Sequence, residues 1–356
     1  MSNLPAITTV ERLEVENFTA FGEAMLDFSP GFNVLVGENG TGKTHLMKLV
    51  YSVLRAFHET RLEGVQSKSV LEERLATKLK SVFKPDELGR LVRRGPGKRK
   101  SRVRLDWTKS SGLSEHVAFE LGSQAKQRVS LESLRDLAEA SAIFLPSREV
   151  LSFYPGFAAS YDRRELEFDA TYYDLCRALE AKPLKRGPRE AQNKSLAEGL
   201  EEALGAKIRL VDGRFKLRFD DGSDLEAHLV AEGLRKLTTV LYLVLNGSLT
   251  GSSMLFWDEP ESNLNPRYVS IVVDVLKELV DLGVQVFLST HDYLVSQKLS
   301  LLATTGAAPI RFFMLTRGDD GVRVEPGESM TDFDEDPILD EFARQYDLEL
   351  QAVADS

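Results

Sequence analysis

The chain has 356 residues, of which 42% are hydrophobic and 28% charged, as in an ordinary globular protein with one large or two smaller domains. Its 45 Lys and Arg against 55 Asp and Glu give a net charge of −10, which argues against a uniformly basic nucleic-acid binder but not against a local basic patch. The single cysteine, Cys176, excludes an intrachain disulfide, so we expect a reduced, cytoplasmic setting. Residues 1–10 lack a signal-peptide pattern, and polar residues interrupt the longest uncharged stretch, so we expect no membrane contact.

The first 60 residues predict three strands and a helix. Residues 10–17 alternate between apolar and charged side chains, and short apolar runs follow at 24–28 and 32–36. An apolar stripe at helical spacing then predicts a helix over 43–58.

Residues 61–140 differ in pattern and indicate an insertion. It contains a predicted helix at 64–83, a basic Gly/Pro segment, and a polar hairpin made by 102–107 and 116–121. The α/β pattern then resumes. We expect strands at 142–145, 206–219, 225–230, 254–257 and 284–288, and helices at 168–181, 190–204, 232–246 and 266–282.

These segments suggest four parts. We expect an ATPase-type core built from residues 1–60 and 141–316, the insertion 61–140, and an acidic tail, 317–356, with a short helix at 338–350. From Glu325 onward the tail carries eleven acidic residues and one basic residue, Arg344. Its Asp332, Asp334 and Asp336 could suggest the metal ligands of a nuclease. A solvated segment is the better interpretation, because too little chain follows residue 291 for a nuclease domain.

A complete phosphate-binding loop lies between the third strand and the first helix. The pattern G-x-x-x-x-G-K-[ST] is matched by Gly37, Glu38, Asn39, Gly40, Thr41, Gly42, Lys43 and Thr44. Glycines let backbone N–H groups converge on phosphate oxygens, and the N-terminus of the helix adds positive potential. We therefore predict that this loop binds ATP, with Lys43 on the β and γ phosphates and Thr44 on Mg²⁺.

An acidic pair follows the apolar strand at 254–257. Asp258 and Glu259 would lie at the carboxyl edge of the sheet, where ligands bind in such folds. We predict that Asp258 holds Mg²⁺ and that Glu259 orients the attacking water. Taken alone, the pair could instead be an exposed strand end before a turn, since Pro260 follows it, but the phosphate loop favours the ligand site.

Together these motifs resemble an ABC-type ATPase head of the SMC/RecF/OLD group. Residues 32–44 resemble its Walker A strand and loop, 231–237 its degenerate signature motif, 258–266 its Walker B and D-loop, and 288–292 its switch-histidine strand end. The resemblance implies a P-loop α/β fold with a mixed β-sheet core, an antiparallel β-subdomain and the inserted helix-and-hairpin segment. It also implies that Ala231, Glu232, Gly233 and Asn263 contact nucleotide and that His291 is a catalytic sensor. A lone histidine is otherwise more often structural.

The phrase from Asp258 to Pro266 is most similar to OLD-like ATPases labelled AAA, many of which serve anti-phage systems of the Gabija, Septu and PARIS types. Three positions differ from the family pattern. Leu234 replaces the second signature glycine, no glutamine follows strand 142–145, and Thr19 replaces a common arginine.

The family's active site is shared between two heads, with the signature helix of one facing the phosphates bound to the other. The resemblance therefore implies a homodimer that closes on ATP, with a higher oligomer left open. It also implies an associated effector protein, such as a nuclease or toxin.

The basic segment allows two interpretations. Arg93, Arg94, Lys98, Arg99 and Lys100 could follow a DNA backbone, or they could form a solvated loop or a docking site for an acidic partner. The aromatic residues nearby, Trp107 and Phe119, give weak support for base stacking.

The sequence therefore leaves two candidate functions and argues against two others. The first is a defence-type ATPase that senses an invader or controls an effector, and the second is a RecF-like DNA-repair ATPase. The degenerate signature argues against a transporter subunit, and intact Lys43, Asp258 and Glu259 argue against an ATP-binding module without turnover.

Overall fold

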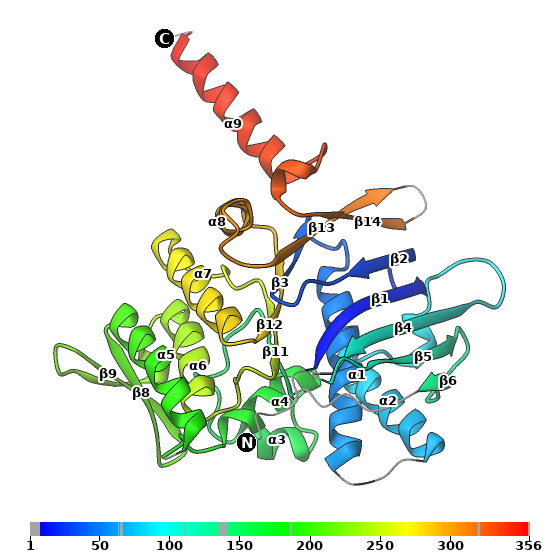
Figure 1. Cartoon of the computed structure of the whole chain (residues 1–356), viewed down its shortest axis with the longest axis horizontal. Helices are drawn as coiled ribbons and strands as arrows, with labels where there is room; N and C mark the ends of the chain where they lie inside the picture. Colours follow the sequence, from blue (N-terminus) through cyan, green and yellow to red (C-terminus); the bar gives the residue numbers. More distant parts are fainter. Residues whose placement is uncertain are drawn as a thin grey trace.

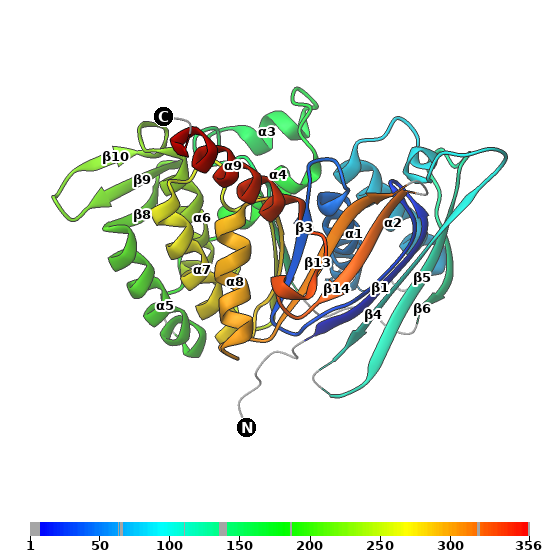
Figure 2. The same ribbon diagram turned by 90° about the horizontal axis from the view of Figure 1, so that it is seen from above.

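The computed structural model describes residues 8–62, 64, 67–109, 111–134, 141–185, 187–318 and 321–354. Within these ranges the chain forms sheets of six, five and three strands, with helices packed between and around them (Figures 1 and 2). No helix in this part of the chain is long and apolar enough to span a bilayer.

The six-stranded sheet is the centre of the molecule. Its order is β14-β13-β3-β12-β11-β7, and only the edge strand β14 runs antiparallel to its neighbour. The strands are β3 (Phe32–Gly37), β7 (Ser141–Leu145), β11 (Ser253–Asp258), β12 (Gln285–Thr290), β13 (Ile310–Gly318) and β14 (Gly321–Gly327). Strands β3, β11 and β12 are buried along nearly their whole length, as expected when both faces of a parallel sheet are covered. The predicted mixed β-sheet core is confirmed.

A five-stranded antiparallel sheet, in the order β2-β1-β4-β5-β6, packs beside it. Its strands are β1 (Thr9–Phe18), β2 (Phe21–Asp27), β4 (Lys100–Thr108), β5 (Ser114–Gly122) and β6 (Ser130–Leu134). The hairpin expected inside residues 61–140 is therefore not a separate polar unit, because β4 pairs along β1 and buries Val103, Leu105 and Trp107. Alternation places these apolar side chains on one face and charged ones on the other.

Two helices fill the space between these sheets. Helix α1 (Lys43–Leu62) and helix α2 (Lys68–Phe83) share a buried cluster with both sheets. Helix α2 begins four residues later than predicted, because the Ser67 hydroxyl accepts the N–H of Val70 and caps it.

The other face of the core sheet carries a helical lobe. It comprises α3 (Phe157–Asp162), α4 (Ala170–Leu179), α5 (Pro188–Leu204), α6 (Glu232–Leu245), α7 (Pro266–Asp281) and α8 (Tyr293–Thr304). A small sheet of β8 (Ala206–Val211), β9 (Arg214–Phe219) and β10 (Asp224–Glu226) closes the lobe at its outer end (Figure 1). The strand predicted at 225–230 is shorter than expected, because a 3-10 turn, Ala227–Leu229, replaces its second half.

The C-terminal part differs most from the prediction. The expected boundary at residue 317 falls inside β13, and β14 then covers the edge of the core sheet, so the tail begins only after Gly327. Helix α8 and strands β13 and β14 were not predicted. The helix expected at 338–350 is present as α9 (Pro337–Ala354), which extends away from the body (Figure 1).

Candidate nucleotide-binding site

The phosphate loop joins the end of β3 to the start of α1. Gly37, Gly40 and Gly42 all have positive φ, at 147°, 78° and 93°. A Cβ on Gly37 would lie 2.4 Å from the carbonyl oxygen of Leu315, and one on Gly42 would lie 2.9 Å from the Phe21 ring. Neighbouring strands therefore enclose the loop so closely that only glycine fits at these two positions.

The Lys43 side chain folds back onto this loop. Its ammonium donates hydrogen bonds to the carbonyl oxygens of Gly37 at 2.6 Å and Glu38 at 3.0 Å. Burial lowers the pKa of Lys43, while the nearby carboxylates of Glu259 and Asp258 oppose that shift. The loop thus holds a buried cation that is electrostatically complementary to phosphate.

Asp258 connects the loop to two strands of the core sheet. The Thr44 hydroxyl donates to its Oδ1 at 2.8 Å, and the Ser289 hydroxyl donates to the same oxygen. Residues 258 and 289 lie opposite each other in the parallel pair of β11 and β12, which explains their proximity. Hydroxyl and carboxylate oxygens are the ligands that Mg²⁺ prefers, so the residues present fit such an ion.

Glu259 and His291 lie beside this carboxylate. The Nδ1 atom of His291 is 3.4 Å from Oε1 of Glu259 and 3.8 Å from Oε1 of Glu261. Glu259 has φ of +49°, and its N–H donates to the Ser289 carbonyl at 3.0 Å. A left-handed backbone is unfavourable for a glutamate, and such strain concentrates at functional sites.

Glu261, which lies within the Walker B segment but was not predicted as a site residue, contacts the end of β12. Its Oε1 accepts the Thr290 hydroxyl at 2.7 Å and the His291 N–H at 3.3 Å. Its Oε2 has no hydrogen-bond partner among the described residues, and burial raises the pKa of the side chain. Glu261 therefore fixes the end of β12 and the backbone of His291.

The predicted signature residues lie at the start of α6. Ala231 is the N-cap, and Glu232 and Gly233 form the first turn. A Cβ on Gly233 would meet the side chain of Leu264 at 2.5 Å, so the helix packs closely against the segment that contains Asn263. The structure thus gathers Lys43, Thr44, Asp258, Glu259 and His291 at one sheet edge and places the signature residues against the adjoining segment, 259–265.

Two basic residues near the site were not predicted. The buried ammonium of Lys236 on α6 donates to the Ser262 carbonyl at 2.8 Å, which ties the signature helix to the segment after Glu259. A guanidinium nitrogen of Arg317 donates to the Asn39 carbonyl at 3.0 Å, and a Cβ on Gly40 would lie 2.7 Å from it. The position of Lys236 just before the apolar run of α6 was a usable signal for it. Arg317 reaches the loop only because β13 pairs with β3.

The segment after β7, which lacks the glutamine that the family pattern has there, also contacts residues 259–265. The Ser147 carbonyl accepts the Ser262 hydroxyl at 3.1 Å, and the buried Glu149 forms an ion pair with Arg235 of α6 at 2.8 Å. These contacts connect the core sheet to the start of the signature helix.

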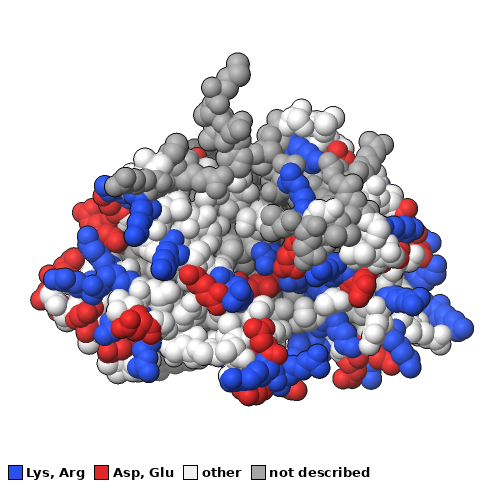
Figure 3. Space-filling view, turned by 90° about the horizontal axis from the view of Figure 1, so that it is seen from below, with Lys and Arg blue, Asp and Glu red and all other residues white. Residues whose placement is uncertain are grey.

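The basic segment is partly neutralised by the chain itself. Lys100 and Arg102 both form ion pairs with Glu120 on the neighbouring strand, whereas Arg94 and Lys98 are exposed on the loop before β4. On the face shown in Figure 3, basic side chains are interspersed with acidic ones.

Two of the tail aspartates bind backbone N–H groups of their own segment. Asp332 accepts the N–H groups of Glu328 and Ser329, and Asp336 accepts those of Ile338 and Leu339. No cluster of three metal-ligating side chains occurs among the described residues.

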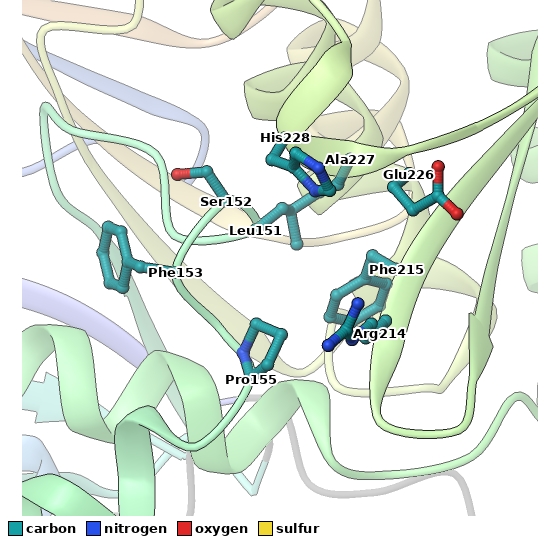
Figure 4. Close-up of a pocket in the computed structure, with 9 residues that line it drawn as sticks. All are labelled: Leu151, Ser152, Phe153, Pro155, Arg214, Phe215, Glu226, Ala227 and His228. Carbon is teal, nitrogen blue, oxygen red and sulfur yellow. The ribbon is translucent and has the colours of Figure 1, made fainter.

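A separate depression of about 270 Å³ lies between residues 151–155 and the β9–β10 hairpin (Figure 4). Arg214, Glu226 and His228 line it, and it shares no residue with the phosphate loop.

This fold and this arrangement of loop, carboxylates and histidine define an ABC-type ATPase of the SMC/RecF group. The chain belongs to the family described as "AAA domain, putative AbiEii toxin, Type IV TA system", which it matches over residues 119–296. A second family, described as "AAA domain", matches residues 12–149.

Curated relatives match over a short stretch. DNA replication and repair protein RecF of Streptococcus uberis is 36% identical over 55 residues, and that of Acidothermus cellulolyticus is 41% identical over 56 residues. In both cases the match covers 15% of this chain and 15% of the relative.

Solved structures extend the similarity to nearly the whole fold. An Smc head bound to the C-terminal winged-helix domain of ScpA has a TM-score of 0.55 at 14% identity, covering 91% of this chain and 98% of the other. An Smc head with an extended coiled coil, bound to the C-terminal domain of ScpA from Pyrococcus furiosus, has a TM-score of 0.52 at 13% identity, covering 97% and 100%.

Proposed function

We propose that the protein binds and hydrolyses ATP with Mg²⁺ and acts as a switch that controls an associated effector. The observation that carries the proposal is the contact between Thr44 of the phosphate loop and Asp258 of β11, with Glu259 and His291 beside it. Residues 1–60 and the part of the chain from 141 to the end of β14 would form the catalytic core, and 61–140 and the tail after Gly327 would adapt it to its partners.

Each side chain has a role that follows from its position. The backbone of residues 37–44 and the Lys43 ammonium bind the phosphates, because N–H groups and a buried cation complement their charge. Thr44 and Asp258 hold Mg²⁺, which neutralises phosphate charge when bound. Glu259 orients and polarises the attacking water, and His291, beside Glu259, senses the γ-phosphate.

The active site is completed by a second head. The start of α6, with Ala231, Glu232 and Gly233, offers helix N–H groups and positive potential to the phosphates held by the other copy. Asn263, exposed on the segment packed under that helix, lies at the same interface. ATP therefore joins two heads, and its hydrolysis releases them.

The effector and the defence role are supported by the family and its neighbours. The matching family is described by a putative toxin of a toxin–antitoxin system, and both solved Smc heads carry a bound protein domain. We infer that the switch acts in anti-phage defence on a nuclease or toxin. The second candidate is a RecF-like repair ATPase that binds DNA directly, which the short matches to RecF favour.

The first experiment measures steady-state ATP hydrolysis and particle mass for the wild type, Glu259→Gln and Lys43→Ala. We expect Glu259→Gln to lose turnover but to associate stably through its heads with ATP and Mg²⁺, so that its particle mass rises, because it keeps every phosphate ligand. Lys43→Ala, the matched control, should lose turnover and remain in its nucleotide-free state. If the particle mass of Glu259→Gln is the same with and without ATP, the active site is not shared between two heads.

The second experiment separates the two candidate functions. Hydrolysis is measured with and without linear duplex DNA, and binding is measured for a variant in which Arg93, Arg94, Lys98, Arg99 and Lys100 are all changed to Gln. A control variant removes the same amount of positive charge elsewhere, at five exposed basic residues: Arg177, Lys182, Lys185, Lys194 and Lys207. If DNA stimulates hydrolysis and only the variant changed at 93–100 loses this effect, the repair function is favoured, because affinity for the DNA backbone depends on the number of basic contacts. Turnover indifferent to DNA favours the effector switch.

A further inference from the structure

Helix α9 carries apolar side chains that lie in solvent. Every side chain from residue 339 to residue 352 is exposed, including Phe342 at 56%, Tyr346 at 62% and Leu350 at 52%. Side-chain packing holds α9 to the body at its first turns. Ile338 packs against the core, and the Phe342 ring lies 4.9 Å from that of Tyr293. The rest of the helix points away from the molecule (Figure 1).

These apolar side chains form one stripe. Leu339, Phe342, Tyr346 and Leu350 follow one another at intervals of three, four and four residues, which places them on one face of an α-helix. A helix of this length is marginally stable alone in water, and its aromatic and aspartate residues are weak helix formers. Burial of the stripe against a partner would supply the missing stability.

The stripe is symmetric about Tyr346. Phe342 and Leu350 lie four residues before and after it, and Leu339 and Val353 lie seven residues before and after it. In an antiparallel pair of α9 helices centred on Tyr346, Phe342 would face the partner subunit's Leu350. Such self-complementarity is what a two-fold interface between identical chains requires.

The charges agree with the same alignment. Each charged residue of α9 is level with an uncharged one of the other copy: Asp340 with Ala352, Glu341 with Gln351, Arg344 with Leu348, Asp347 with Gln345, and Glu349 with Ala343. A parallel pair would instead place Glu349, the acidic residue that borders the stripe, level with its own copy, and like charges in contact are destabilising.

We propose that α9 pairs antiparallel with α9 of a second copy of this chain, centred on Tyr346, in a contact that needs no nucleotide. Because the ATP-dependent contact involves other surfaces, one chain would carry two different two-fold interfaces, and ATP would convert a dimer into a tetramer or a longer assembly. The pairing would also bring the partner's helix against Phe342, whose ring contacts Tyr293, two residues after His291.

The test is analytical ultracentrifugation of the full chain without nucleotide, over a dilution series. Leu350→Asp, on the stripe, is compared with Leu348→Asp, an exposed leucine on the opposite face of the same helix. We expect a wild-type dimer that dissociates on dilution, a monomeric Leu350→Asp protein, and a Leu348→Asp protein like the wild type. A wild type that is monomeric at every concentration overturns the proposal, and the stripe would then bind a different protein. Equal effects of the two substitutions overturn it as well.

The alignment is tested by cross-linking. In a Cys176→Ser background, Tyr346→Cys should form an intermolecular disulfide under mild oxidation, because a residue on a two-fold axis meets its own copy. Leu348→Cys should not. A disulfide formed equally by both variants overturns the alignment. None of these measurements involves ATP, so failure of the nucleotide-dependent switch would leave their outcome unchanged.

Discussion

The hydroxyl of Thr44 donates a 2.8 Å hydrogen bond to the carboxylate of Asp258, which is 214 residues away in the chain. This contact joins the first turn of α1 to the end of β11, and Ser289 of β12 donates to the same carboxylate oxygen. Three oxygen-bearing side chains from three elements thus meet at the edge of the core sheet, where a parallel sheet presents its ligands.

Asp258→Asn tests the importance of the charge at this position. The amide oxygen can still accept both hydroxyls, so we expect thermal stability to change by about 1 kcal/mol or less. Loss of the negative charge removes the preferred Mg²⁺ ligand, so hydrolysis should fall roughly 100-fold. The measurements are ATP turnover against Mg²⁺ concentration and thermal unfolding without nucleotide. Wild-type turnover in this variant would show that Asp258 does not hold the ion.

Glu259→Gly tests whether the strained backbone at this position is retained for activity. Because Glu259 has φ of +49°, glycine should relieve about 1 kcal/mol of strain while it removes the carboxylate. We expect a higher unfolding temperature and no measurable hydrolysis. Asn263→Gly is the control, because Asn263 has φ of +61° but asparagine tolerates that region better. A less stable Glu259→Gly protein would contradict the strain argument.

Local patterns explain why much of the fold was predictable. The strand, loop and helix at 32–58 have strong periodicity and a sequence motif, and the apolar runs at 142–145 and 254–257 became β7 and β11. The order of these strands was not predictable, because parallel neighbours such as β3 and β12 are set by long-range packing rather than by nearby residues.

The site shows the same limit. Residues in the phosphate loop and the acidic pair have recognisable spacing, and the structure places them together. Arg317 had no such signal, because its contact with Asn39 depends on the pairing of β13 with β3. The acidic composition after Glu325 also concealed β14, whose alternation is short and lies at a sheet edge.

Asp174→Ala should strongly destabilise the fold around α1, α2 and α4. This carboxylate, whose side chain is 10% exposed, accepts the Tyr51 hydroxyl at 2.7 Å and lies 3.2 Å from the ammonium of Lys78. Its removal leaves the buried Tyr51 hydroxyl without its acceptor and the Lys78 ammonium with Glu59 alone, so we expect a loss of about 2 kcal/mol in the free energy of unfolding. Glu180→Ala, which breaks an exposed ion pair with Arg177, should cost less than about 1 kcal/mol. Chemical denaturation of both variants checks this, and equal losses would contradict it.

Arg317→Ala should weaken nucleotide binding with little effect on the fold. The side chain is exposed, and its hydrogen bond to the Asn39 carbonyl steadies the phosphate loop. Loss of one such bond is worth about 1 kcal/mol, so we expect KM for ATP to rise by roughly five-fold with kcat nearly unchanged. Arg317→Lys should recover part of the affinity, and Arg323→Ala on the neighbouring strand should leave KM unchanged. An unaltered KM in Arg317→Ala would remove Arg317 from the site.

Glu261→Gln should change the pH dependence of stability in a defined direction. Burial raises the pKa of Glu261 above its usual value of 4.5, so the folded state binds its proton more tightly than the unfolded state does. The contribution of this carboxyl to stability therefore falls as pH rises from about 4.5 through the higher pKa of the folded state. Glutamine does not titrate but can still accept from Thr290 and His291. The unfolding temperature of Glu261→Gln minus that of the wild type should thus be larger at pH 8 than at pH 4.5, with Glu198→Gln on the surface of α5 as the control. If this difference in unfolding temperature instead becomes smaller as pH rises, the fold stabilises Glu261 as a carboxylate. An ion pair with His291 would have that effect.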